Sequence, residues 1–234
     1  LVGSNCGLIG PNAAIVIDGS AFWMSRNGNM YIYEGALPLQ LSPNPVRRYV
    51  FDLLEVVDWE EIYCWSNIEY NEIWWLFPRS GEDDCSDYVV FNYAERIWYT
   101  GTIERTAALD RGILEKPVAT DWDGTIWYHE IGHDAGTSVM TAYVKSAPMD
   151  IDEGDRVIRV DSVVNDFVLA GSCDLIMSSR RYPMDTLRTQ SAKTVQTTTR
   201  KVDMRLEGRQ VAVEVRSDGL GDFWRLGQLR MNVG

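Results

Sequence analysis

Short apolar segments separated by polar turns run along the whole chain, and many are rich in aromatic and β-branched residues. Such side chains suit the pleated surface of a β-sheet, and glycine, asparagine and aspartate in the turns favour tight reversals. The stretch 71–101 shows this pattern most densely and predicts three consecutive strands, at Glu72–Phe77, Asp87–Asn92 and Arg96–Gly101. We therefore expect a β-meander in the first half of the chain.

The first strand of this meander is apolar on both faces. Side chains alternate across a strand, so Trp74 and Leu76 lie on one face while Ile73, Trp75 and Phe77 lie on the other. A sheet with two apolar faces needs cover on both sides. Propeller blades and sandwich layers meet this demand, as do partner chains.

The same pattern predicts further strands around the meander. The turns Asp18-Gly19 and Asn27-Gly28 are strong hairpin signals because their residues tolerate positive φ. The segment Arg48–Asp58 fits either a short helix or a turn, since its period is ambiguous. Strands are expected at Ala14–Ile17, Ala21–Met24, Met30–Glu34, Ile62–Asn67, Thr102–Thr106, Pro117–Asp121 and Thr125–Ile131.

Residues 139–234 predict a second group of short strands without long helices. Apolar and polar residues alternate most clearly over Gln210–Arg216, which directs Val211, Val213 and Val215 to a core. Strands are expected at Val139–Ser146, Arg156–Val164, Cys173–Arg181, Lys193–Thr199, Val202–Leu206, Gln210–Arg216 and Phe223–Val233.

Together these elements predict an all-β fold of two domains. In residues 1–138 the motifs GSAFWMS, NEIWWLF and GTIWYHE echo one another, which favours a region of propeller-like blades. About three blades are too few to close a propeller, so this region is expected to be part of a larger one. Residues 139–234 predict an antiparallel β-sandwich.

Charge divides the chain at the same place. Residues 1–138 hold 21 acidic and 8 basic residues, whereas residues 139–234 hold 13 acidic and 14 basic residues. The protein therefore lacks an overall basic footprint for gripping nucleic acid. No run of 18 apolar residues is present, so no membrane span is expected. Cys6, Cys64, Cys85 and Cys173 lack metal or disulfide spacing and are interpreted as thiols in a reducing compartment.

The sequence His129-Glu130-Ile131-Gly132-His133 matches the HExxH pattern of zinc hydrolases. That pattern works on a helix, where both imidazoles share one face and the glutamate acts as general base. Here the motif follows a predicted strand, which would separate the two histidines by about 13 Å. The chain has no third histidine, so we interpret the motif as a strand end and turn, with the zinc hydrolase as a lesser alternative.

Two acidic clusters and the abundant aromatic residues invite other interpretations. Glu82-Asp83-Asp84 and Asp150-Asp152-Glu153-Asp155 could donate carboxylates to calcium, but neither meets the EF-hand pattern, and solvated turns are favoured. Flat aromatic rings suit sugar faces, so a glycan- or receptor-binding module is an alternative function. Burial in a core is the favoured use of most tryptophans.

A series of motifs, in order along nearly the whole chain, resembles structural tail proteins of short-tailed bacteriophages. These are the tail-hub or nozzle proteins, also called packaged-DNA stabilisation proteins. The motifs are Cys6-Gly7-Leu8-Ile9-Gly10-Pro11-Asn12-Ala13, Ala21-Phe22-Trp23-Met24, Tyr49-Val50-Phe51-Asp52, Asn71-Glu72-Ile73-Trp74-Trp75, Asp87-Tyr88-Val89-Val90-Phe91-Asn92-Tyr93, Arg105-Thr106-Ala107, Tyr128-His129-Glu130 and Trp224-Arg225-Leu226-Gly227.

The resemblance implies a virion component of the tail, assembled in the host cytoplasm and without enzymatic activity. It implies a ring-shaped homo-oligomer that contacts the portal or adaptor and other tail proteins, and that closes or extends the portal channel. DNA would pass transiently through this ejection conduit without specific binding, past an acidic wall that repels phosphate. No catalytic, cofactor-binding or metal residues are implied, and the block containing His129 and Glu130 is structural in that family.

Overall fold

The computed structural model describes residues 5–54, 59–151 and 153–234. The described chain is mostly β-structure in several antiparallel sheets, which confirms the predicted all-β class. No sheet formed by these residues closes on itself. Nor do they contain a helix long and apolar enough to cross a membrane.

The chain divides into two compact units, Leu1–Ile131 and Gly132–Gly234. The boundary expected from charge, after residue 138, lies a few residues beyond this division. The first unit contains 20 acidic and 8 basic residues, and the second contains 14 of each. The net charge of −12 therefore resides in the first unit.

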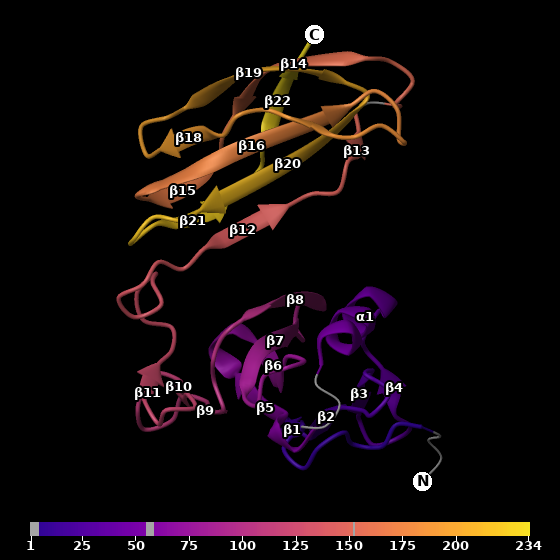
Figure 1. Ribbon diagram of the computed structural model, residues 1–234, viewed down its shortest axis with the longest axis vertical. Helices are drawn as coiled ribbons and strands as arrows, with labels where there is room; N and C mark the ends of the chain where they lie inside the picture. Colours follow the sequence, from indigo (N-terminus) through magenta and orange to yellow (C-terminus); the bar gives the residue numbers. More distant parts are fainter. Residues whose placement is uncertain (1–4, 55–58, 152) are drawn as a thin grey trace. The chain divides into compact units, whose positions relative to one another are not determined.

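The first unit contains three antiparallel sheets, each a simple meander in chain order (Figure 1). The first sheet comprises β1 (Ala14–Ile17), β2 (Ser20–Met24), β3 (Met30–Tyr33) and β4 (Leu39–Gln40). The second comprises β5 (Tyr63–Asn67), β6 (Glu72–Pro78), β7 (Cys85–Asn92) and β8 (Ile97–Thr102). The third comprises β9 (Ala107–Leu109), β10 (Val118–Thr120) and β11 (Ile126–Tyr128).

The second sheet is covered on both faces, as its two apolar faces predicted. Ile73, Trp75 and Phe77 of β6 join a core that includes residues of the first sheet. Leu76 joins a different core, which includes Ala108 of β9 and Ala119 of β10. Successive sheets of the first unit therefore pack face to face in chain order.

One helix covers part of the first core. α1 (Asn44–Leu53) begins after Pro43 and carries another proline at its second position, where no helical N–H donor is lost. Val46, Tyr49, Val50 and Leu53 follow helical spacing and pack on the first core, which resolves the ambiguity over Arg48–Asp58 in favour of a helix. The rest of that prediction, residues 55–58, lies outside the described residues. Two 3-10 turns, η1 (Trp59–Glu61) and η2 (Ile68–Tyr70), flank β5.

The strand predicted at Thr102–Thr106 is wrong. Thr102 ends β8, and β9 begins only at Ala107. Ile103 leaves the ladder after one backbone hydrogen bond to Ser86, and its side chain packs on the core between the second and third sheets. The segment is thus a connection between sheets, which its β-branched composition did not reveal.

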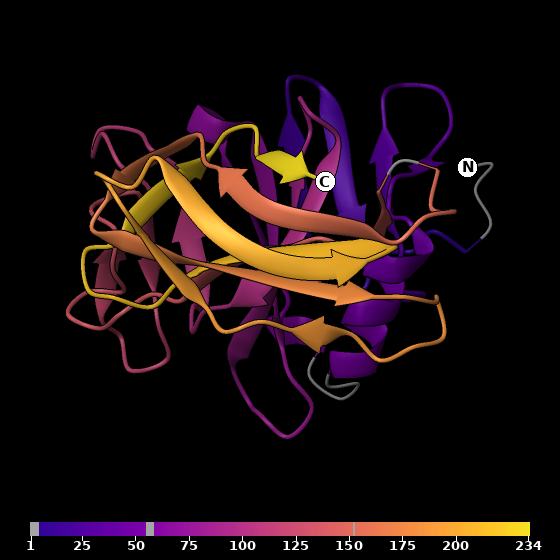
Figure 2. The same ribbon diagram turned by 90° about the horizontal axis from the view of Figure 1, so that it is seen from above.

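The second unit contains two main antiparallel sheets and a strand pair. The larger sheet comprises β12 (Ala142–Lys145), β13 (Met149–Asp150), β16 (Ser172–Arg180), β17 (Arg188–Thr189), β18 (Lys193–Gln196) and β20 (Gln210–Ser217). The smaller comprises β14 (Ile158–Val164), β19 (Lys201–Gly208) and β22 (Arg230–Val233), and β15 (Phe167–Ala170) pairs with β21 (Phe223–Leu226). Figure 1 shows the smaller sheet lying over β16 and β20, and Figure 2 shows these layers from above.

Both sheets contribute to one core. Val211, Val213 and Val215 of β20 are buried in it, as their alternation predicted, together with Met204 of β19 and Val160 of β14. The single strand predicted over Phe223–Val233 is wrong, because β21 and β22 are separate strands that pair with different partners. The break falls at Gly227, whose N–H donates to the Asp166 carbonyl.

Candidate functional site

The HExxH segment is not helical. β11 ends at Tyr128, and the His129 N–H donates to the Pro117 carbonyl at 2.9 Å, which continues the pairing with the neighbouring segment. Glu130 then adopts a positive φ of 59°, and Gly132 one of 77°. The strand predicted at Thr125–Ile131 is too long, because β11 covers only Ile126–Tyr128 and the chain bends from His129 onward. The expected strand end and turn is present, and the helical face that a zinc motif requires is not formed.

The two histidines of this motif belong to different units and have separate partners. His129 Nε2 accepts a hydrogen bond from Arg105 Nε at 3.1 Å, and its ring meets Trp65 edge-on at 5.8 Å. The His133 ring stacks on Phe223 at 4.6 Å in the second unit. Within the described residues no three His, Cys, Asp or Glu side chains are grouped closely enough to hold a metal ion.

Burial, and to a smaller extent the adjacent Arg105 guanidinium, lower the pKa of His129 to about 4. A neutral imidazole at pH 7 is consistent with the acceptor role of Nε2 toward Arg105. The Arg105 guanidinium also lies over the Trp127 ring, 4.9 Å from its centroid. His129 therefore has a structural role: it accepts a hydrogen bond from Arg105 and packs against Trp65.

Glu130 belongs to a polar and aromatic group that we call the Glu130 cluster: Asn67, Glu72, Trp74, Tyr99 and Glu130. The Asn67 amide donates to Glu130 Oε1 at 3.0 Å, and the Trp74 indole N–H donates to Glu72 Oε2 at 2.9 Å. Partial burial of the carboxyl group raises the pKa of Glu130, and the nearby Glu72 raises it further. Burial followed by a hydrogen bond to Glu72 raises the pKa of Tyr99 strongly.

Rings surround this cluster. Trp74 lies 5.4 Å from Trp65, 4.6 Å from Tyr88 and 6.3 Å from Tyr99, measured between ring centroids. Two carboxylates beside several aromatic rings can accept hydrogen bonds from hydroxyl groups while a ring supports an apolar face. Sequence reasoning missed this cluster, because Glu72 and Glu130 are far apart in the chain and no local motif links them.

The described residues of the two acidic clusters singled out for calcium form no group that could hold an ion. Glu82, Asp83 and Asp84 are exposed in the loop between β6 and β7. Asp150 accepts a hydrogen bond from the Gln210 amide at 2.8 Å, and Asp155 pairs with Arg156 at 3.8 Å. Asp152 lies outside the described residues, and Glu153 is exposed.

The buried thiols are poor nucleophiles. Burial raises the pKa of Cys85 to about 12 and that of Cys173 to about 11. Cys64 is fully buried, and burial raises its pKa as well. The thiolate is the reactive form of cysteine, and a raised pKa disfavours it at neutral pH. These cysteines therefore act as small apolar side chains in the cores.

The outer faces of the first and third sheets are apolar and exposed. On the third sheet, Leu109 is 67% exposed, Ile126 66% and Tyr128 56%, opposite the face that buries Ala108 and Ala119. On the first sheet, Val16 is 69% exposed and pairs with Ala21, which pairs in turn with Tyr33, also exposed. Among the described residues, the face-to-face series of three sheets therefore ends on each side in a face with exposed apolar side chains.

No family model matches the chain, and no curated protein matches it.

Proposed function

We propose that this protein is a structural component of a short-tailed phage virion, located in the tail nozzle or hub. Copies assemble into a ring around the tail axis, form part of the DNA ejection conduit, and close or extend the portal channel. The protein has no enzymatic role in this proposal. Its other partners are the portal or adaptor and neighbouring tail proteins, with assembly in the host cytoplasm.

The observation that carries this proposal is the open series of sheets in the first unit. Three antiparallel meanders pack face to face in chain order, which is how propeller blades follow one another. The apolar end faces, marked by Val16 on the first sheet and by Ile126 and Tyr128 on the third, call for further blades. A second copy of the chain supplies them if the first sheet of one copy packs on the third sheet of the next.

Contacts of this kind are heterologous, and they close into a ring when the rotation between copies permits it. The second unit would then form a β-sandwich domain carried by each subunit, since its two sheets share one core. The concentration of net negative charge in the first unit supports a channel wall that repels phosphate and lets DNA slide.

Paired charge substitutions on the end faces test the assembly. Val16→Lys spoils the first-sheet face and Ile126→Lys spoils the third-sheet face, so each variant alone should stay monomeric in sedimentation velocity while the unaltered protein forms closed oligomers. A mixture of the two variants retains one intact contact and should give dimers only. Val168→Lys, at an exposed apolar position of the second unit, is the matched control and should assemble normally.

Two results would contradict this assembly. One is an unaltered protein that stays monomeric at high concentration. The other is oligomerisation that neither lysine variant disturbs while the folded state is preserved, as checked by circular dichroism.

A glycan- or receptor-binding tail module is a second candidate, favoured by the Glu130 cluster. Trp74 and Tyr99 are half-buried beside Glu72 and Glu130, an arrangement suited to sugar hydroxyls and ring faces. A glycan array probed with the full chain tests this candidate. Glycan binding that is lost in Trp74→Ala and retained in Trp23→Ala would favour the binding module over the nozzle.

A further inference from the structure

A cleft at one end of the second unit is lined by arginines. It lies where β16 ends, between the loop that follows this strand, β17 and the end of β19, and its volume is about 360 Å³. This volume is within the range of small-ligand sites. The lining residues are Ser179, Arg180, Arg181, Asp185, Thr186, Leu187, Arg188 and Glu207.

The cleft lies in the most basic segment of an acidic protein. Residues 180–209 contain eight Lys or Arg residues and three Asp or Glu residues, whereas the whole chain has a net charge of −12. The balance over the whole sequence conceals this local excess of positive charge. The cleft itself carries three arginines and two carboxylates, and a concave surface with an excess of one sign of charge attracts ions of the opposite sign.

Both carboxylates of the cleft already have partners. Glu207 pairs with Arg181 at 2.8 Å. Asp185 accepts a hydrogen bond from the Tyr182 N–H at 3.1 Å, within the loop after β16. Neither carboxylate is paired with Arg180 or Arg188, so these two cations are left to attract an anion.

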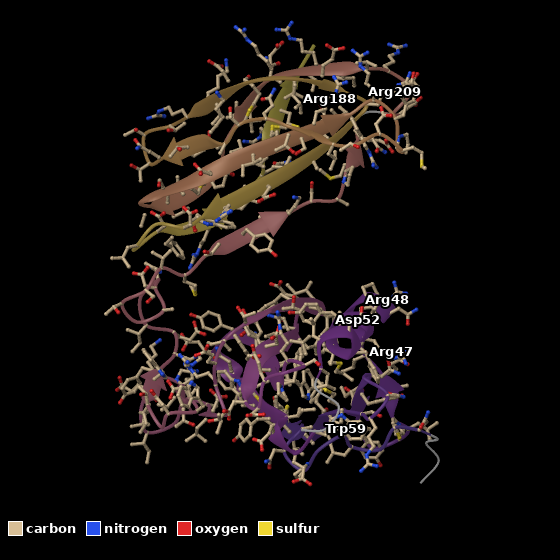
Figure 3. The ribbon with its side chains drawn as sticks, in the orientation of Figure 1. Arg47, Arg48, Asp52, Trp59, Arg188 and Arg209 are labelled. Atoms are coloured by element: carbon tan, nitrogen blue, oxygen red, sulfur yellow. The ribbon has the colours of Figure 1, made fainter. Side chains whose placement is uncertain are left out.

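Several guanidinium donors of the cleft and its rim remain uncommitted. Arg180 uses Nε to donate to Gln210 Oε1 at 2.6 Å, which fixes its side chain and leaves its terminal amino groups. Arg188 is exposed and lines the cleft (Figure 3). Within the described part of the chain, no acceptor pairs with its guanidinium group. Arg209 stacks on the Tyr182 ring at 4.9 Å, and its buried Nε has no acceptor among the described residues.

A cleft of similar volume in the first unit offers a useful contrast. It is lined by Asn44, Arg47, Arg48, Phe51 and Asp52 of α1 (Figure 3). There Arg47 is already committed, since its Nε donates to the Asn27 carbonyl at 2.8 Å and its guanidinium lies over Phe51. In the cleft of the second unit, three arginines accompany two carboxylates, one of which, Glu207, is ion-paired with Arg181.

We propose that the arginine cleft of the second unit binds a phosphate group, either as free phosphate or within a polynucleotide backbone. Planar guanidinium groups match the geometry of phosphate oxygens and form charge-assisted hydrogen bonds with them. Arg180, Arg188 and Thr186 line the cleft and carry guanidinium and hydroxyl donors for a tetrahedral oxyanion. This site does not depend on the proposed nozzle function.

Titration calorimetry on the full chain tests the site, with inorganic phosphate as one probe and a short DNA duplex as the other. Ionic strength is held constant with sodium chloride, because nonspecific charge binding varies with salt. We expect saturable binding with one site per chain. Arg188→Gln should weaken it about tenfold or more, as expected for a lost charge-assisted hydrogen bond.

Arg200→Gln is the matched control, because it removes one charge from an exposed arginine outside the cleft. It should change the affinity less than about twofold, since a single distant surface charge is screened. Thermal unfolding of both variants verifies that they are folded. Arg180→Gln provides a second variant of the cleft and should also weaken binding.

The two probes distinguish the source of the phosphate. If the duplex binds, phosphate displaces it and Arg188→Gln weakens the binding, the ligand is a polynucleotide backbone. If phosphate binds and the duplex does not, the ligand is the free ion. Saturable binding of neither probe would overturn the proposal. Equal weakening by Arg188→Gln and Arg200→Gln would also overturn it, because the cleft would then have no special role.

Discussion

His129 illustrates how a residue selected by a motif acquires a different role from its surroundings. Its imidazole accepts from Arg105 and lies edge-on to Trp65, which favours the neutral form. The HExxH pattern identified this histidine as a candidate site residue, but it did not predict the buried contact with Arg105. Arg105 precedes β9 and His129 follows β11, so the contact depends on the third sheet, in which β9 and β11 both pair with β10 and residues distant in the chain come together.

The lowered pKa of His129 predicts a stability that depends on pH. Its pKa is about 4 in the folded protein, against about 6.5 in an unfolded chain. The unfolded chain therefore binds the proton first, so this stabilisation is complete above about pH 6.5 and is lost as the pH falls toward 4. The partly exposed ring should contribute about 2 kcal/mol, less than the full shift would give.

Urea unfolding at pH 7 and at pH 5 measures this contribution. In His129→Gln the difference in unfolding free energy between the two pH values should shrink, because the titrating group is gone while an amide oxygen can still accept from Arg105. His133→Gln is the control. An unchanged pH dependence in His129→Gln would contradict the assignment.

Gly28 gives a second prediction at a single position. It has a φ of +73° in the turn between β2 and β3, and a Cβ atom there would overlap the ring of Phe51 from α1. Gly28→Ala should cost about 2 kcal/mol or more, from backbone strain together with displacement of the ring. Gly19→Ala, with a φ of +81° and open space around it, should cost only about 1 kcal/mol. Equal losses in chemical unfolding would show that the contact with Phe51 is unimportant.

Strands and helices could be predicted from the sequence where the pattern was local. The two faces of β6 and the alternation of β20 follow directly from their side chains, and both faces of β6 are buried as expected. The ends of elements and the partners of strands were harder. Ile103 has a strand-forming side chain but lies in a connection, and Gly227 separates β21 from β22 because those strands have different partners.

The Glu130 cluster and the arginine cleft could not be predicted at all. Asn67 and Glu130 meet only because the second and third sheets pack together. Arg180 and Arg188 line one cleft because β16 pairs with β17, which the sequence does not reveal. Sites of this kind depend on strand order and sheet packing, which short-range sequence patterns do not predict.

Opposite faces of β6 should respond differently to truncation. Leu76→Ala removes a buried side chain from the core between the second and third sheets, and Ile73→Ala removes one from the core with the first sheet. Each should cost about 2–4 kcal/mol. Hydrogen exchange should then accelerate in β9–β11 for Leu76→Ala and in β1–β4 for Ile73→Ala.

Ile97→Ala, at an exposed position of β8, is the control and should change stability by less than about 0.5 kcal/mol. Identical exchange patterns for Leu76→Ala and Ile73→Ala would contradict the assignment of the two faces to separate cores.

Taken as a whole, the chain consists of two units with separate cores, and this division should appear in unfolding. Leu175 is fully buried in the core of the second unit. Leu175→Ala should reduce the unfolding free energy of the second unit by about 2–5 kcal/mol. In scanning calorimetry the transition temperature of the second unit should fall, and that of the first unit should stay unchanged. A single cooperative transition that shifts as one would show that the units do not unfold independently.

Electron microscopy of the purified protein tests the proposed nozzle most directly. We expect closed rings with a central channel, in which the first sheet of each copy packs on the third sheet of its neighbour and acidic residues of the first unit line the wall. Single copies at high concentration would contradict the ring. Rings whose acidic residues face only the outer solvent would contradict the role of the first unit as a conduit for DNA.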